Sequence, residues 1–103
     1  MARFSRINVV LKMRETGIVP VFYNKDAEVC RSVIKASYDG GIRVFEFTNR
    51  GDFANELFIE LNKWAAKEIP EMIIGAGTVV DPATAAIYIQ SGANFIVSPL
   101  LNQ

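Results

Sequence analysis

Four short apolar segments, separated by stretches in which apolar residues recur at helical spacing, constrain the fold of this chain most strongly. The segments begin near residues 18, 42, 72 and 94. Such intervals suit right-handed crossovers, in which each helix returns the chain to the next strand of a parallel sheet. The sequence therefore predicts an α/β fold in which an initial helix is followed by three strand–helix units and a final strand.

Capping and helix-breaking residues mark where the expected helices begin and end. The first sixteen residues have the pattern of an amphipathic helix, and Gly17 follows as its terminator. Asp26, Asp52 and Asp81 each stand where a side chain can cap a following helix, and a proline after Asp81 occupies the first helical position. The apolar positions that predict the buried face of the first helix are Phe4, Ile7, Val10 and Leu11.

The number of strands is too small for a closed barrel. Eight strand–helix units form a (β/α)8 barrel of the TIM type, which takes about 250 residues. This chain has 103 residues, and no helix follows the fourth apolar segment, Ala93–Val97. A small open α/β domain is one interpretation. The other, which the missing helix favours, is a single partial domain over residues 1–103: a parallel half-barrel with an N-terminal helix, about four strands and three further helices.

Composition excludes several classes of function. Eleven basic residues balance eleven acidic ones, so no global positive field favours nucleic acid as a partner. The chain has no histidine, which removes His-based metal sites and Ser-His-Asp triads built from this chain alone. No apolar run approaches the roughly 20 residues that span a bilayer. We expect a cytoplasmic protein without a membrane partner, in which the single Cys30 is a small buried apolar residue.

The segment from Arg43 to Arg50 carries the most informative ionisable residues. Strand alternation places Glu46 on one face with Val44 and Thr48, and puts two phenylalanines on the other face, beneath the helices. Glu46 then faces the other layer or a barrel interior, where desolvation raises the pKa of a carboxyl group. This makes Glu46 a candidate general acid–base. A structural ion pair with Arg43 or Arg50 is the alternative.

Three further residues stand at strand ends, where parallel α/β folds bind their ligands. The Arg50 guanidinium can hold a carboxylate or phosphate with two parallel hydrogen bonds, although a solvated loop arginine fits equally well. Gly75-Ala76-Gly77-Thr78 follows a strand, and its glycines and the Thr78 hydroxyl give a weak indication of an anion-binding loop. Pro99 either ends strand pairing or forms a rigid apolar wall of a pocket.

Four motifs, taken together in this order, resemble the first half of one enzyme family. They are Gly17–Val21, Gly41–Arg50, Gly75–Val79 and Phe95–Pro99. The combination of a Glu-x-Thr-x-Arg strand end, GAGTV and a strand ending in Ser-Pro is similar to the class I aldolases for 2-keto-3-deoxy-6-phosphogluconate (KDPG) and 4-hydroxy-2-oxoglutarate (KHG). The similarity runs through all 103 residues.

The resemblance implies a lyase that forms a homotrimer of (β/α)8 barrels. Enzymes of this family cleave a keto acid, such as a phosphorylated keto-deoxy sugar acid, into pyruvate and an aldehyde. They use a Schiff base and need no metal or other cofactor. By resemblance, Glu46 is the catalytic general acid–base that moves protons through a water molecule. Arg50 and Thr78 bind the pyruvate carboxylate, and Pro99 lies in the pocket wall.

The chain departs from the family because the Schiff-base lysine and the phosphate-binding loops lie on later strands. Of the five lysines, four fall in helical patterns, and Lys25, in a loop with polar neighbours, fits a solvated residue. We therefore expect the intact protein to be an aldolase and the 103-residue chain alone to be inactive. One alternative is a non-catalytic half-barrel that self-associates through its open edges, with Phe95 and Ile96 on the terminal strand. Another is an anion-binding module built on Gly75–Thr78.

Overall fold

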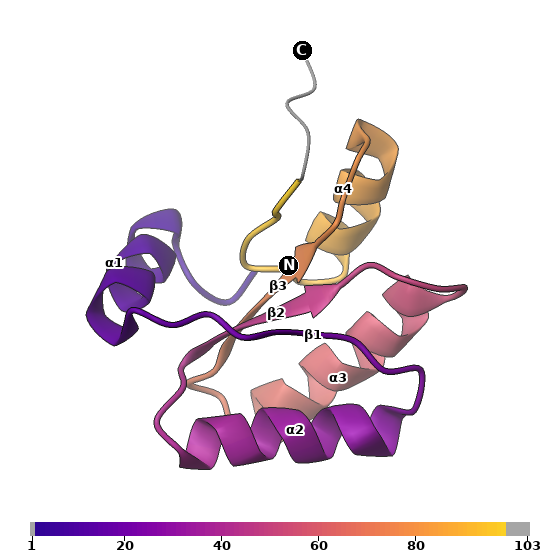
Figure 1. The fold of residues 1–103 in the computed structure, drawn as a ribbon. Coiled ribbons are helices and arrows are strands. Elements are labelled where there is room, and N and C mark those ends of the chain that lie inside the picture. Colours follow the sequence, from indigo (N-terminus) through magenta and orange to yellow (C-terminus); the bar gives the residue numbers. More distant parts are fainter. Residues whose placement is uncertain (1, 99–103) are drawn as a thin grey trace.

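Helices and strands alternate along the chain as the sequence predicts. The computed structural model of the protein describes residues 2–98. Its elements are α1 (Arg6–Thr16), β1 (Val21–Phe22), α2 (Ala27–Asp39), β2 (Val44–Thr48), α3 (Ala54–Glu68), β3 (Ile73–Gly77) and α4 (Pro82–Gln90) (Figure 1). The strands form a parallel sheet in the order β1-β2-β3. The α/β class and the parallel sheet are confirmed.

Helices α2, α3 and α4 pack on one face of the sheet, which we call the outer face. In Figure 1, α2 and α3 run side by side beneath the strands. Phe45 and Phe47 of β2 enter this layer and join Phe58 of α3 and Tyr88 of α4, and none of the four is more than 1% exposed. The ring centroids of Phe58 lie 5.8 Å from Phe47 and 5.3 Å from Tyr88. The two strand phenylalanines therefore pack beneath the helices, as predicted.

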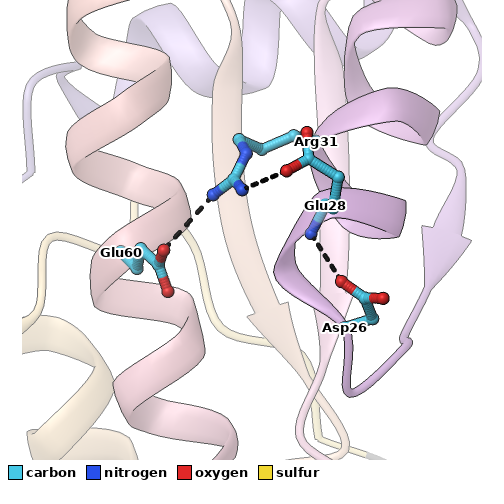
Figure 2. A network of polar contacts seen from close by, with 4 residues as sticks. All are labelled: Asp26, Glu28, Arg31 and Glu60. Atoms are coloured by element: carbon cyan, nitrogen blue, oxygen red, sulfur yellow. Dashed lines mark hydrogen bonds and ion pairs between the residues drawn. The ribbon is translucent and has the colours of Figure 1, made fainter.

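A polar network on the protein surface joins α2 to α3. The Asp26 carboxylate accepts a hydrogen bond of 2.9 Å from the Glu28 N–H, which caps α2 as the sequence predicts. Arg31 pairs with Glu28 at 3.0 Å and reaches Glu60 of α3 at 3.3 Å (Figure 2). Because both glutamates are more than half exposed, each ion pair contributes only about 0.2–1 kcal/mol. The apolar layer beneath holds the two helices together.

Helix α1 lies on the opposite face, which we call the inner face. Its Val9 is 4% exposed and packs with Val44 and Ile73 at the amino ends of β2 and β3. The predicted buried face is confirmed at Phe4, which packs against this cluster, and is wrong within the helix itself, where Val9 and Met13 face the sheet instead. The apolar residues that remain more than half exposed are Ile7, Val10 and Leu11.

The first predicted strand is shorter than its apolar run. Only Val21–Phe22 forms β1, and Ile18 and Val21 are more than half exposed. A strand buried on both faces was expected here. Within residues 2–98, β1 is an edge strand with a neighbour on one side only, and no helix covers its inner face.

The fourth predicted strand, Ala93–Val97, is reduced to one parallel bridge between Ile96 and Ala76. The segment still runs beside β3, because the Asn94 and Val97 N–H groups donate to Ile74 and Ala76 carbonyls at 3.0 and 2.8 Å. Within residues 2–98 its strand pairing is with β3 alone, and the Asn94 side-chain oxygen accepts from the Arg3 and Phe4 N–H groups at 3.1 and 3.2 Å. The described part of the protein therefore has three strands and a bridge, rather than about four strands.

Helix α3 begins without the predicted Asp52 cap. Phe53 occupies the N-cap position with a left-handed φ of 61°, and no side chain caps the helix. Gly51, with a φ of 75°, turns the chain just before it. This tight turn supplies the Phe53 carbonyl, rather than a carboxylate, to the start of the helix, where it accepts from the Glu56 N–H. The Asp81 cap of α4 is confirmed, since its carboxylate accepts from the Thr84 N–H at 2.8 Å.

Candidate active site

The sheet register brings Arg50 and Thr78 to the same edge. Thr48 of β2 lies opposite Gly77 of β3, and the Asn49 N–H donates to the Gly77 carbonyl at 2.8 Å. Arg50 and Thr78 follow these paired residues directly, and both are exposed. The backbones of the two residues therefore meet at the carboxyl ends of the strands, as the sequence predicts.

Glu46 lies on β2 two residues before Thr48, and its side chain is on the inner face. Its carboxylate sits over Gly77 so closely that a Cβ on this glycine would overlap it. Glu46 is partly buried, and this burial raises the pKa of its carboxyl group above the ordinary value. No ion pair within residues 2–98 involves it. A carboxyl group with a raised pKa and no cationic partner is suited to giving and taking protons.

The two arginines that could have neutralised Glu46 do not do so in the part of the chain that the structure describes. The Arg43 guanidinium donates to the Tyr38 and Ile42 carbonyls at 2.8 and 2.9 Å, and it lies 3.9 Å from the centroid of the Tyr38 ring. Arg50 is exposed and makes none of the ion pairs found between described residues. The acid–base interpretation of Glu46 is the one this geometry favours.

The two glycines of the Gly75–Thr78 motif leave room for side chains of neighbouring elements. Both Gly75 and Gly77 lie within β3, where a Cβ on Gly75 would overlap the Phe95 ring. The Ala76 and Val79 N–H groups already donate hydrogen bonds of 3.0 and 3.2 Å to carbonyl groups of the segment that pairs with β3, at Phe95 and Val97. An anion loop needs unpaired N–H groups. The Ala76 and Val79 N–H groups are therefore not available to an anion, and the anion-binding loop stays a prediction that rests on the Thr78 hydroxyl.

Thr78 adopts a backbone conformation that a β-branched residue rarely takes. Its φ of 57° is left-handed, which costs on the order of 1–3 kcal/mol. The residues that follow Thr78 line a cavity of about 260 Å³, whose walls are mainly apolar and include Val79, Pro82 and Ile96. Thr78 itself is not among the residues that line this cavity. Pro99, predicted to form a pocket wall, lies outside the described residues.

Sequence reasoning missed two residues that support this edge, Asn49 and Tyr88. The buried Tyr88 hydroxyl donates to Asn49 Oδ1 at 2.7 Å, and Asn49 Nδ2 lies 3.4 Å from the Thr78 carbonyl oxygen. Burial raises the pKa of Tyr88 to about 12, so its hydroxyl stays protonated and remains a donor. The available signal was a tyrosine in an apolar helix, because a buried tyrosine hydroxyl needs a polar partner.

The remaining reactive side chains take no part in this edge. The Cys30 thiol is buried, donates to the Asn24 carbonyl at 3.1 Å and has a pKa raised by desolvation, which confirms the prediction of a buried residue. Lys25 is exposed, as expected. Among residues 2–98, no three acidic or cysteine side chains gather closely enough to hold a metal ion, and no helix is long and apolar enough to cross a membrane.

Comparison with known proteins identifies the fold. The family described as KDPG and KHG aldolase matches residues 9–103. The chain belongs to this aldolase family. The KHG/KDPG aldolase of Escherichia coli strain K12 is 40% identical to it over 86 residues, which are 84% of this chain and 38% of the relative. The 2-dehydro-3-deoxy-phosphogluconate aldolase of Dickeya dadantii is 37% identical over the same shares.

Solved structures of aldolases superpose on the same part of the fold. The KDPG aldolase of Legionella pneumophila, with pyruvate captured as a covalent carbinolamine, matches with a TM-score of 0.73 and 32% identity, over 82% of this chain and 39% of that one. The KDPG aldolase of Zymomonas mobilis ZM4, with 3-phosphoglycerate, gives a TM-score of 0.78 and 28% identity, over 95% and 44%. The aldolase-family chain thus spans about two fifths of its relatives and corresponds to part of a TIM-type barrel.

Proposed function

We propose that residues 1–103 belong to a class I aldolase that cleaves KDPG, KHG or both into pyruvate and an aldehyde through a Schiff base. In this proposal the chain carries the acid–base and carboxylate-binding groups. The observation that carries it is the Glu46 carboxyl group, which is partly buried, has a raised pKa and lacks an ion-pair partner among the described residues. It stands beside the strand ends that bear Arg50 and Thr78, in a member of the KDPG and KHG aldolase family.

Each proposed residue has a role that its chemistry supports. A lysine amine attacks the keto carbon of the substrate and loses water, which gives an iminium that draws electrons from the bond to be cleaved. Glu46, acting through a water molecule, takes the proton from the hydroxyl group as the carbon–carbon bond breaks. It later returns a proton to the methylene carbon of the resulting enamine, and water then hydrolyses the iminium, which releases pyruvate and the lysine amine. Arg50, with the Thr78 hydroxyl, holds the carboxylate so that the keto carbon stays in reach.

The Schiff-base lysine in this proposal lies on a strand that is not among β1, β2 and β3. Those strands contain no lysine, and Lys25, which follows β1, is exposed beside polar residues. A nucleophilic lysine needs a depressed pKa, which an apolar pocket or a neighbouring cation provides. We therefore propose that residues 1–103 alone have no aldolase activity and that the rest of the barrel supplies the lysine and the phosphate-binding loops.

The remaining proposals follow from membership of the family. Pro99 forms an apolar wall of the substrate pocket, the complete enzyme is a homotrimer, and it works in the cytoplasm without a metal or organic cofactor. Its partners are small keto acids, and it binds neither nucleic acid nor membranes. The balanced charge of the chain supports the exclusion of nucleic acid.

Proton exchange at the pyruvate methyl group tests the role of Glu46. In the complete aldolase chain, Glu46→Gln should slow exchange with deuterated water by about 10²- to 10⁴-fold, because a positioned acid–base group contributes that much. Borohydride trapping of pyruvate should persist in the same variant, since it reports the lysine. Full exchange in Glu46→Gln would show that another group moves the proton.

Self-association is a second candidate function, supported by the apolar residues left exposed on α1, on β1 and in the segment between them. These residues are Ile7, Val10, Leu11, Ile18 and Val21. An uncovered apolar helix face beside an open strand edge favours pairing with another copy of the chain. Light scattering of residues 1–103 tests this candidate. A monomer that persists at high concentration would remove it.

A further inference from the structure

Asn49 is the residue through which three elements meet at the carboxyl edge of the sheet. Its N–H donates to the Gly77 carbonyl of β3 at 2.8 Å, and its side-chain oxygen accepts from the Tyr88 hydroxyl of α4 at 2.7 Å. Its side-chain nitrogen lies 3.4 Å from the Thr78 carbonyl oxygen, a long hydrogen bond. The orientation of the amide follows from the partners, because a carbonyl oxygen only accepts and so must face the nitrogen.

Asn49 is connected to both residues that are proposed to bind the substrate carboxylate. Asn49 is covalently joined to Arg50, whose N–H bonds back to the Thr48 carbonyl at 2.9 Å in a tight turn. It is hydrogen-bonded to the peptide of Thr78, whose left-handed φ of 57° needs support from its surroundings. Asn49 therefore lies between the two residues proposed to bind the carboxylate, and it touches the backbone of both.

The Tyr88 ring, whose hydroxyl donates to Asn49, is held firmly by the outer aromatic layer. Tyr88 is 1% exposed, and its ring stands edge-on to Phe58, which in turn packs against Phe47 of β2. Because the hydroxyl is fixed by the ring, the Asn49 side chain has a stationary donor on the α4 side. The outer aromatic layer is thereby coupled to the strand ends through one amide.

We propose that Asn49 is a positioning residue for the substrate carboxylate, which sets the spacing between Arg50 and Thr78 by linking both to Tyr88. This inference rests on the proposed aldolase function. A group that fixes the spacing of two ligands acts on affinity for the keto acid, whereas Glu46 acts on proton transfer. The two roles can be separated by measuring half-saturation and maximal rate.

The test uses the complete aldolase chain, pyruvate as the probe and borohydride trapping as the readout. In Asn49→Leu, the pyruvate concentration that half-saturates trapping should rise about tenfold, as loss of a hydrogen bond of ordinary strength predicts. The trapping rate at saturating pyruvate should change by less than about twofold, because the lysine and Glu46 are untouched. Tyr88→Phe should raise half-saturation in the same direction and by a smaller factor.

The double variant Asn49→Leu/Tyr88→Phe separates positioning from stability. Asn49→Leu leaves the buried Tyr88 hydroxyl unpaired, which lowers the melting temperature, whereas the double variant removes both polar partners and should recover it. The pyruvate concentration that half-saturates trapping should stay raised in the double variant. Asn62→Leu is the matched control: Asn62 of α3 donates to the Ser91 carbonyl after α4 at 3.0 Å, so its loss should leave half-saturation unchanged.

Two results would overturn the inference while leaving the proposed function intact. One is a folded Asn49→Leu with unchanged half-saturation. The other is a double variant in which affinity for pyruvate recovers together with stability. If Asn49→Leu does not fold, the double variant decides the question by the same readout. A folded complete chain that traps no pyruvate would instead contradict the proposed function, and the role of Asn49 with it.

Discussion

The two faces of the sheet differ in how completely they are covered. On the outer face, three helices bury an aromatic layer in which Phe45, Phe47, Phe58 and Tyr88 are all at most 1% exposed. On the inner face, one helix covers the amino ends of the strands, and the partly buried Glu46 stands nearer the carboxyl ends. The outer face is therefore the source of most of the stability, and the inner face carries the group with the perturbed pKa.

The two glycines of β3 leave space for different side chains on the inner face. Gly75 makes room for the Phe95 ring in the apolar cluster, and Gly77 makes room for the Glu46 carboxylate. The inner face thus changes from apolar packing to contact with a carboxylate within two residues along β3. Substitutions on the two faces should therefore change the free energy of unfolding by different amounts.

Removing an aromatic ring from the outer layer should have the largest effect. Phe58→Ala deletes a fully buried ring that contacts Phe47 and Tyr88, so we expect the free energy of unfolding to fall by about 3–5 kcal/mol. Urea unfolding of residues 1–103 measures this change. A loss below about 1 kcal/mol would contradict the assignment of stability to the outer face.

Placing a methyl group on the two glycines should separate the halves of the inner face. Gly75→Ala drives a Cβ into the Phe95 ring, which is packed with its neighbours, and should cost about 1–3 kcal/mol of unfolding free energy. Gly77→Ala meets the end of a flexible side chain and should cost less, while displacing the Glu46 carboxylate. Paired urea titrations decide the order, and a larger loss for Gly77→Ala would reverse it.

The charge of Glu46 should make stability depend on pH. Burial raises the pKa of this carboxyl group in the folded chain above its ordinary value of 4.5, so the folded state holds a proton that the unfolded state releases. This contribution to stability is fully present below about pH 4.5 and is lost as the pH rises through the folded pKa.

Glu46→Gln should remove this pH-dependent contribution. Relative to the native chain, the variant should become progressively more stable from about pH 4.5 towards neutral pH. Urea titrations of both chains at several pH values give the difference directly. A difference that is constant with pH would mean that the pKa of Glu46 is not raised by folding.

Changing an exposed apolar residue of α1 should have the smallest effect on stability. Ile7 is 70% exposed, so Ile7→Ser should change the free energy of unfolding by no more than about 0.5 kcal/mol. Val9→Ser on the same helix is the matched control, and it should cost considerably more because Val9 is 4% exposed. Equal losses for the two variants would show that the exposed face of α1 is covered in solution.

The features that could be predicted from sequence are those with local causes. The order of elements follows from apolar periodicity, and the caps at Asp26 and Asp81 follow from side chains two or three residues from the N–H groups they accept from. The opposed faces of β2 follow from strand alternation, which placed Glu46 away from the phenylalanines. These inferences needed no knowledge of what packs against each element.

The features that could not be predicted depend on contacts distant in sequence. Tyr88 and Asn49 are 39 residues apart, and no local pattern signals their hydrogen bond. The apolar spacing of α1 is real, yet which side of the helix meets the sheet depends on how the helix docks. Asp52 has the chemistry of a cap, but the left-handed turn at Gly51 and Phe53 replaces it with a backbone carbonyl.

Borohydride trapping of pyruvate, followed by mass spectrometry of the modified peptide, tests the central claim most directly. It is applied to residues 1–103 alone and to the same residues fused to the remaining part of the Escherichia coli relative. We predict no adduct on the shorter chain, and an adduct on a lysine of the added part in the fused barrel that weakens in Arg50→Ala. An adduct on Lys25 of the shorter chain, or none on a folded fused barrel, would contradict the account.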